Sequence, residues 1–378
     1  MLVNKSKNEA SPIYFKNLDG LRFFAALLVF FSHAFNLHRE QWGTFSQSST
    51  FDFIAKTASY GHIGVGIFFV LSGFLIFSLF FRELERNGQI QWKHFFVRRI
   101  LRIWPLYFVV ILFGFLIFPH LPWGSETKHS LLNFSIFLSN FDEIWYGAQD
   151  HLNFLTVTWS ISVEEQFYYF TIIAFLLIPS KYFAKILPYY FILIILSSIG
   201  FKIFHAHDER VLYYHSLSVG FYLACGGLIA YFNRDRKLEQ YFKEWSCRSV
   251  FIAQIFLLCF VLGVVVTRKY NPLFFDYALA FAFSGILLLQ TFGEETILSL
   301  DKVPFFKVFG KITYGFYLYH TLILFYVANW ANTYFKINTL PYFVAYLLLV
   351  FTLSILVSKF SFAYFEKYFL NLKHRFKS

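Results

Sequence analysis

The chain has 378 residues, of which 57% are hydrophobic and only 15% are charged, and its mean hydropathy is +0.53. Soluble domains carry roughly 25% charged residues, so this composition excludes a soluble globular protein, and the high hydrophobicity also excludes a disordered chain. The formal net charge is +11. Because Lys and Arg gather between the apolar segments, we expect them to orient the chain in a bilayer and not to bind nucleic acid.

Ten apolar stretches are long enough to cross a bilayer, and each is expected to be a helix because lipid offers the backbone no hydrogen-bond partner. They cover residues 18–37, 61–81, 103–121, 157–179, 186–203, 214–232, 249–267, 274–292, 312–332 and 341–360. The stretch Leu131–Phe141 is too short to span and is expected to be re-entrant or interfacial. The predicted fold class is all-α, with residues 1–378 forming a single membrane-embedded domain and no fused extracytoplasmic domain.

The basic residues predict which way the chain crosses the membrane. One alternate set of connections, with both termini, holds 23 Lys and Arg, and the other set holds seven. Connections rich in Lys and Arg stay on the cytoplasmic side. We therefore expect both termini in the cytoplasm. The cysteines Cys225, Cys247 and Cys259 show no metal-binding spacing and predict free thiols, and we expect no metal site.

The first span carries charges that a bilayer tolerates poorly. Arg22 and His33 are eleven residues apart, which places them within ~20° of the same helix face and about 16 Å apart along the axis. Asp19 precedes Arg22 by three residues and can pair with it. Two interpretations stay open. In the first, Arg22 snorkels to the inner membrane surface and His33 only packs against other helices. In the second, the two residues belong to a polar track inside the bundle, with His33 as a base partway across the membrane.

The second span and the loop after it supply further polar candidates. Ser72 stands beside Gly73 in a run of small residues, which suits either close helix packing or space for a substrate. Arg98, Arg99 and Arg102 form the most basic segment, with the last two on one helix face. They serve either as orientation signals or as a site for a phosphate-rich ligand, because guanidinium groups bind phosphate bidentately.

Later spans add carboxylates and a third histidine. The fourth span begins with Trp159 and, a few residues on, Glu164 and Glu165. A capping box at the start of the helix explains Glu165 but not Glu164. The alternative is that these carboxylates line a pocket at the outer end of the span. His320 lies in the middle of the ninth span, where it either packs or lines a cavity.

Together these motifs resemble the acyltransferase-3 family of integral membrane O-acyltransferases. The matching blocks follow family order over essentially the whole chain: Leu18–Arg22 with His33, Phe68–Phe74, Arg98–Arg102, Thr158–Tyr168, Tyr317–His320 and Tyr364–Lys367. The chain departs from the family pattern at Tyr319, where Trp is common, and at Tyr368, where Pro is common.

The resemblance implies a reaction and a set of residue roles. The donor would be cytoplasmic acetyl-CoA or another short acyl-CoA, with no tightly bound cofactor. The acceptor would be a hydroxyl of a cell-surface or lipid-linked carbohydrate, such as lipopolysaccharide O-antigen. His33 would act as general base or transient acyl carrier with Arg22 and Asp19. The CoA phosphates would meet Arg98, Arg99 and Arg102, and the acceptor pocket would use the residues Ser72, Trp159, Glu164, Glu165 and His320.

A rival class is a polytopic transporter or flippase for a lipid-linked sugar, because buried polar residues would suit it equally well. No inverted repeat or pair of broken helices, which transporters often show, is evident in the sequence. The expected partners are acyl-CoA, the carbohydrate acceptor and membrane lipids, without nucleic acid. The acceptor glycan, acyl length and oligomeric state are not encoded in any pattern found in the chain.

Overall fold

The computed structural model describes residues 15–147, 153–176, 178–267 and 272–376. Within these ranges the chain is helical and contains no strand. The helices are α1 (Leu18–Asn36), α2 (Ser49–Ser59), α3 (Gly64–Asn87), α4 (Trp92–Leu112), α5 (Leu131–Ser135), α6 (Ser139–Tyr146), α7 (Thr158–Leu176), α8 (Ser180–Phe204), α9 (Glu209–Tyr214), α10 (Ser216–Phe232), α11 (Lys237–Lys243), α12 (Cys247–Thr267), α13 (Pro272–Phe292), α14 (Pro304–Phe309), α15 (Thr313–Tyr334), α16 (Leu340–Ser361) and α17 (Lys367–Leu372).

Every one of the ten predicted spans lies on a long helix of the structure. Eight helical segments in the described ranges are long and apolar enough to cross a membrane. The two long helices outside that group are α7 and α15, which carry Glu164, Glu165 and His320. Their polar side chains lower their hydropathy, and both helices are largely buried among the others. The chain is therefore an all-α polytopic membrane protein.

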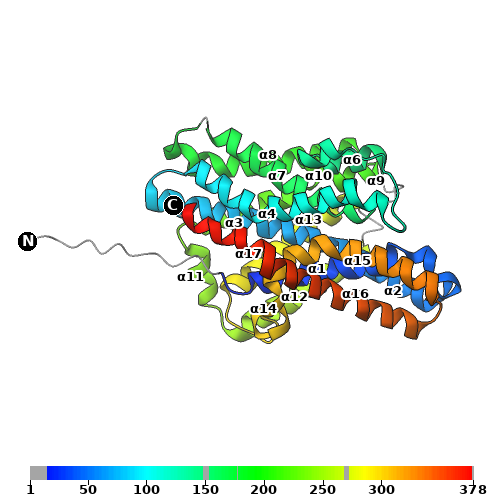
Figure 1. The fold of residues 1–378 in the computed structure, drawn as a ribbon. Coiled ribbons are helices and arrows are strands. Elements are labelled where there is room, and N and C mark those ends of the chain that lie inside the picture. Colours follow the sequence, from blue (N-terminus) through cyan, green and yellow to red (C-terminus); the bar gives the residue numbers. More distant parts are fainter. Residues whose placement is uncertain (1–14, 148–152, 177, 268–271, 377–378) are drawn as a thin grey trace, which may run out of the picture.

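The helices run side by side, and their connections gather at two ends of the bundle (Figure 1). The helices α11 and α17 lie at one end, called here the α11 end, and α2, α6 and α9 lie at the other, called the α9 end. In the described part of the chain, the Lys- and Arg-rich connections around α11, α14 and α17 lie at the α11 end, and the cytoplasmic location of that end stays a prediction. The segment Leu131–Phe141 forms α5 and the start of α6, two helices too short to span.

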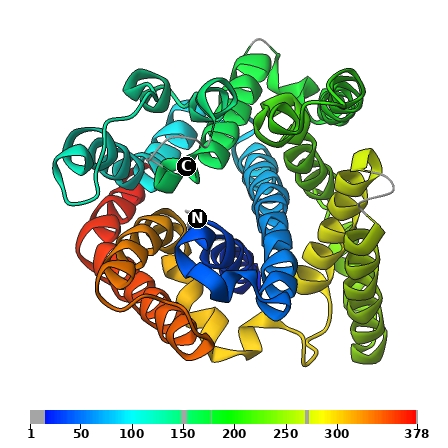
Figure 2. The same cartoon turned by 90° about the vertical axis from the view of Figure 1, so that its right-hand side faces the viewer.

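The helix α1 lies between α3 and α15, with the remaining long helices arranged around them (Figure 2). Two glycine contacts bring α3 close to α10. A Cβ on Gly73 would stand 2.0 Å from the Leu223 carbonyl oxygen, and a Cβ on Gly226 would stand 2.0 Å from the Val70 oxygen. The small residues of the second span therefore serve close helix packing, as one of the two sequence interpretations expected.

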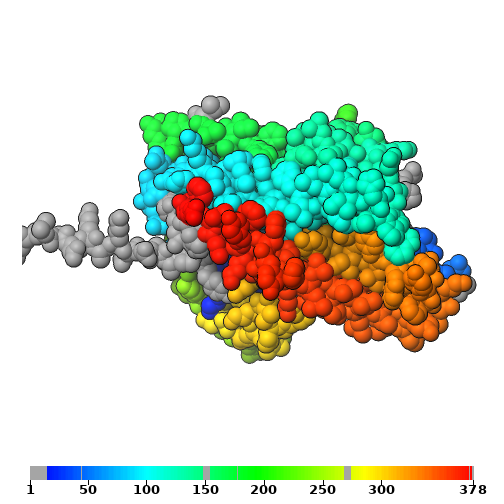
Figure 3. Space-filling model, in the orientation of Figure 1, coloured from blue at the N-terminus to red at the C-terminus, as the bar shows by residue number. Residues whose placement is uncertain are grey.

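The end of the chain returns to the bundle and packs beside α4. A π-helical turn at Phe362–Glu366 joins α16 to α17, and the short 3-10 helix Lys373–Phe376 follows. Figure 3 shows this C-terminal segment lying along the surface next to α4. The segment therefore covers one side of the region where α1, α4 and α15 approach each other.

Candidate active site

A polar cavity of about 290 Å³ lies among α1, α3, α4, α7, α15 and the C-terminal segment. We call it the basic cavity, because five cations line it against three carboxylates. The cations are Arg22, Arg99, Arg102, Lys311 and Lys373. Its deeper wall is apolar and aromatic, formed in part by Phe68, Phe69, Tyr314 and Tyr317. The cavity thus changes from charged to largely apolar along its length.

Most of the cationic charge in the basic cavity is not neutralised by ion pairs. Arg22 pairs with Asp19 at 2.5 Å, the i,i+3 contact that the sequence predicted. Within the described part of the chain, the other four cations have no carboxylate within 4.0 Å. The Arg99 guanidinium instead stacks on Tyr168, 4.9 Å from the ring centroid. Such a surplus of guanidinium and ammonium groups suits a phosphate-rich ligand.

Lys373 lines this cavity from the C-terminal segment, outside the spanning helices. Burial lowers the pKa of its ammonium group to about 6, with a further contribution from the positive charges of three neighbouring arginines. A nearby anion would restore the charged form of this side chain.

Two of the three carboxylates at the cavity, Glu164 and Glu366, are held by neutral hydrogen-bond donors. Ser72 donates to Glu164 at 2.6 Å, and the Tyr168 hydroxyl lies 3.3 Å from the other oxygen of Glu164. Ser361 donates to Glu366 at 3.0 Å. The second span therefore contributes a hydroxyl that orients a carboxylate in the same cavity as the arginines.

His33 and His320 form a hydrogen-bonded pair deeper in the bundle. His33 Nδ1 lies 2.9 Å from His320 Nε2, and the two rings are within 7° of parallel. His320 is fully buried, and its Nδ1 lies 3.1 Å from the Phe316 carbonyl oxygen. His33 therefore points into the bundle and not toward lipid.

The partners of the pair determine where the protons sit. A carbonyl oxygen can only accept, so His320 Nδ1 carries the proton that bonds to Phe316. In a neutral imidazole the other nitrogen is then an acceptor, and His320 Nε2 accepts the Nδ1 proton of His33. The remaining nitrogen of His33, Nε2, is left with its lone pair. This tautomer makes His33 Nε2 a proton acceptor.

Tyr317 lies between the basic cavity and the histidine pair. It lines the cavity, and its ring centroid is 6.0 Å from that of His320, one turn further along α15. Its hydroxyl lies 2.8 Å from Ser160 Oγ, which fixes the ring against α7. Phe68 packs on the other side, with ring centroids 5.5 Å apart. The apolar end of the cavity therefore points toward the histidines.

The structure brings together many, but not all, of the residues that the sequence analysis selected. Six of the selected residues line the basic cavity: Asp19, Arg22, Ser72, Arg99, Arg102 and Glu164. Arg98 does not line it: its guanidinium donates to the Phe376 carbonyl at 2.9 Å and lies 3.6 Å from Glu83. Glu165 accepts from the Trp104 indole at 3.2 Å. Trp159 packs instead on Tyr213 and Tyr214 at the α9 end.

Two expectations about this region were incomplete. Glu164 was expected at the outer mouth of the fourth span, yet it lies inside the bundle beside Ser72 and in the cavity that holds Arg99. The site also contains Lys311, Glu366 and Lys373, which the sequence analysis did not select. Glu366 belongs to a recognised motif, but the other two show no local pattern and reach the site through the fold of α15 and the C-terminal segment.

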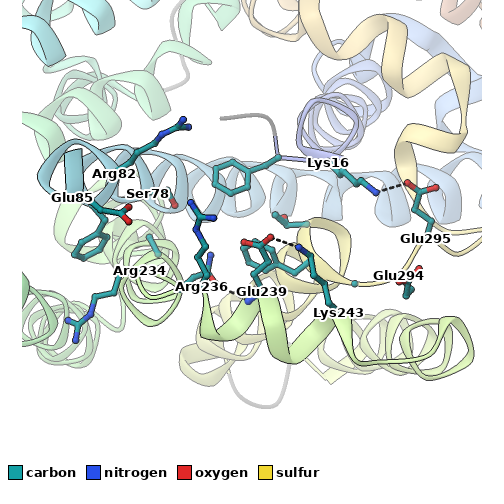
Figure 4. Close-up of a pocket in the computed structure, with 17 residues that line it drawn as sticks. Lys16, Ser78, Arg82, Glu85, Arg234, Arg236, Glu239, Lys243, Glu294 and Glu295 are labelled. Atoms are coloured by element: carbon teal, nitrogen blue, oxygen red, sulfur yellow. Dashed lines mark hydrogen bonds and ion pairs between the residues drawn. The ribbon is translucent and has the colours of Figure 1, made fainter. Parts of the chain in front are cut away.

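A second charged pocket, of about 480 Å³, lies at the same end between α3, α10, α11 and α13 (Figure 4). Its five cations are nearly balanced by four carboxylates, and two of the cations form ion pairs within the pocket: Lys16 lies 3.1 Å from Glu295, and Lys243 lies 2.6 Å from Glu239. It contains none of the residues selected from the sequence. The basic cavity is therefore the better candidate for binding an anion.

Fold and site together define a polytopic, all-α membrane protein with a basic cavity that leads to a buried histidine pair. A model of the acyltransferase domain matches residues 15–359. The chain belongs to this acyltransferase-3 family, as the sequence motifs indicated.

Curated relatives carry O-acetyltransferase names. The peptidoglycan O-acetyltransferase OatA of Listeria monocytogenes is 28% identical over 337 residues, covering 85% of this chain and 51% of the relative. The O-acetyltransferase OatA of Staphylococcus aureus is 26% identical over 354 residues, covering 88% and 54%. A putative O-acetyltransferase of S. aureus strain COL is 26% identical over 376 residues, covering 93% and 57%. The chain spans about half the length of these relatives, and no solved structure matches it.

Proposed function

We propose that this protein is a membrane O-acetyltransferase that moves an acetyl group from cytoplasmic acetyl-CoA to a carbohydrate hydroxyl. The observation that carries the proposal is the basic cavity with the histidine pair beyond its apolar end. Family membership and the names of the relatives support acyl transfer. The distribution of Lys and Arg supports a cytoplasmic α11 end in a bacterial inner membrane.

The donor would enter the basic cavity with its thioester leading. CoA carries several negative charges at one end and an apolar pantetheine arm at the other. Arg99, Arg102 and Lys373 would hold the phosphates, and Arg22, on α1 with His33, would face the arm. The aromatic wall at Phe68 and Tyr317 would guide the thioester toward the histidines. This order matches the change from charged to apolar lining.

The chemical step would use the free nitrogen of His33. His33 Nε2 accepts the proton of the acceptor hydroxyl while the oxygen attacks the thioester carbonyl carbon. The new C–O bond forms, the C–S bond breaks, and the imidazolium returns its proton to the departing CoA sulfur. His320 holds His33 in the tautomer that this step needs. Such a base contributes about 10²–10⁴ in rate.

A covalent route through His33 is the alternative within the same site. His33 Nε2 would attack the thioester carbon directly, release CoA, and pass the acetyl group to the acceptor hydroxyl. Rapid quenching after mixing with labelled acetyl-CoA alone separates the two routes. A label that stays on the protein and is lost in His33→Ala supports the relay.

The proposed acceptor is a cell-surface carbohydrate. Peptidoglycan is the first polymer to test, because the Listeria relative is named for it, and lipopolysaccharide O-antigen is the second. Purified protein in lipid nanodiscs receives labelled acetyl-CoA with each polymer. Acceptor-dependent release of CoA with label in the polymer supports the proposal. A transporter or flippase would release no CoA, and that result would overturn the proposed function.

A further inference from the structure

A larger pocket, of about 710 Å³, opens at the α9 end of the bundle, opposite the basic cavity. We call it the outer pocket. It lies where α3, α7, α8, α9, α10 and α13 meet, and Figure 2 looks onto this end of the molecule. Of the residues predicted from the sequence to serve the site, only Trp159 lines it. Most of its remaining lining comes from α8, α9, α10 and α13, which do not line the basic cavity.

One wall of the outer pocket is a cluster of three aromatic rings. Trp159 packs against Tyr213 and Tyr214, with ring centroids 5.0 and 5.3 Å away, and the two tyrosines are 4.8 Å apart. Trp159 of α7 is only 4% exposed, so the half-buried tyrosines of α9 provide most of the accessible ring surface, and they carry hydroxyl groups at their edges. Aromatic faces of this kind pack well on the C–H faces of sugar rings.

The lining of the outer pocket also includes an ion pair between the spanning helices α8 and α13. Lys202 pairs with Asp276, and only 2% of the lysine side chain is exposed, whereas 33% of the aspartate is. The Tyr222 hydroxyl lies 3.5 Å from the other oxygen of Asp276. Buried ion pairs in spanning helices are costly and mark functional sites. The exposed part of Asp276 is available to sugar hydroxyls from the pocket.

The charges of the outer pocket balance, in contrast with those of the basic cavity. Lys202 and Arg210 are matched by Asp276 and Glu209 among its lining residues. A polyanion such as CoA gains little from such a site. A neutral ligand rich in hydroxyl groups can both donate to the carboxylates and accept from the cations.

The outer pocket adjoins the histidine pair and the donor site. Phe69 of α3 lines both the outer pocket and the basic cavity. His62 lines the outer pocket, and its neighbour Gly61 packs directly on α1, where a Cβ would stand 1.9 Å from the Leu28 carbonyl oxygen and 3.0 Å from Cβ of Ser32, the residue before His33. Both ends of α1 are therefore close to a cavity: Asp19 and Arg22 line the basic cavity, and the segment that packs beside Ser32 lines the outer pocket.

We infer that the outer pocket binds the acceptor as a neutral, hydroxyl-rich carbohydrate, with its sugar rings against Trp159 and Tyr213 and its hydroxyls against Asp276. This inference rests on the proposed function, because it names the substrate that meets the donor at His33. A volume of about 710 Å³ is within the range of ligand pockets that bury most of a drug-sized molecule, which suits a short stretch of a glycan.

The test separates acceptor binding from donor binding. Protein in nanodiscs is assayed with labelled acetyl-CoA and the surface polysaccharide of a strain that lacks this gene. Tyr213→Ala should raise the KM for the polysaccharide about tenfold, in line with a lost stacking contact, and leave the KM for acetyl-CoA within twofold. Tyr213→Phe keeps the ring and should restore the wild-type value. Tyr241→Ala, at an exposed tyrosine of α11, is the matched control and should behave as wild type.

A second arm avoids substitutions that prevent folding. In Tyr213→Cys the protein folds with a small side chain, and a bulky membrane-impermeant thiol reagent is added afterwards. Labelling should block transfer, and the polysaccharide should protect against it, while the reagent leaves the wild type active. An unchanged polysaccharide KM in Tyr213→Ala, or labelling without loss of transfer, would overturn the outer-pocket inference alone. If the wild type transfers no acetyl group, the proposed function fails first.

Discussion

The tautomer of His33 depends on one hydrogen bond, and that bond can be removed. His320→Leu takes away the acceptor for His33 Nδ1, so Nε2 no longer has to be the unprotonated nitrogen. We expect kcat to fall by about 10- to 100-fold while the KM for acetyl-CoA stays constant. His320→Gln can present an amide oxygen near the lost Nε2 and should recover part of the rate. Equal losses in both variants would show that His320 only fills space.

Two arginines of α4 should determine donor affinity. Each hydrogen bond to a charged group is worth about 1.5–3 kcal/mol, so Arg99→Ala with Arg102→Ala should raise the KM for acetyl-CoA by at least tenfold. Arg98→Ala is the matched control, because Arg98 lies outside the basic cavity. Steady-state kinetics in nanodiscs measure all three. A larger effect from Arg98 than from the pair would contradict the assignment.

Lys373 should make donor binding depend on pH. Its pKa of about 6 in the free protein leaves it mostly neutral at pH 7.5, and phosphates beside it would raise that pKa. Binding then takes up protons, so affinity for acetyl-CoA should be constant below pH 6 and fall as the pH rises above it. Calorimetry in two buffers measures the uptake. The proton uptake at pH 7.5 should be smaller in Lys373→Met than in the wild type. The uptake that remains in this variant measures the titration of CoA itself. The same uptake in both proteins would place Lys373 away from the phosphates.

At the scale of elements, the contact between α3 and α10 supports both cavities, because α3 supplies Ser72 to one and Phe69 to both. Gly73→Leu would drive a side chain into the α10 backbone at Leu223. We expect the variant to accumulate poorly and to lose at least 10 °C in Tm in detergent. Gly200→Ala, where a Cβ meets open space, should match the wild type. Normal melting of Gly73→Leu would show that the helices can move apart.

The sequence predicted elements better than their contacts. Hydropathy located all ten long helices, since each must satisfy its own backbone in lipid. The pairing of Asp19 with Arg22 followed from helix spacing alone. The contact of His33 with His320 could not be predicted in this way, because it joins residues 287 positions apart. Lys373 joined the site only because the C-terminal segment folds back beside α4.

At the scale of the whole molecule, two cavities of different character open at opposite ends of one bundle. The basic cavity suits a polyanion and the outer pocket suits a neutral, hydroxyl-rich ligand. A transfer between two compartments needs such an arrangement, because donor and acceptor can meet at α1 without either one crossing the membrane. The charge balance of each cavity, and not its size, distinguishes the two roles.

The central claim is that His33 performs the transfer, and His33→Ala tests it most directly. The variant is purified in nanodiscs beside the wild type, and both receive acetyl-CoA labelled on the acetyl group together with the acceptor polysaccharide. We predict that His33→Ala binds acetyl-CoA with an affinity within about threefold of the wild type, but that transfer of label falls by at least 10². Transfer at the wild-type rate in His33→Ala would contradict the claim.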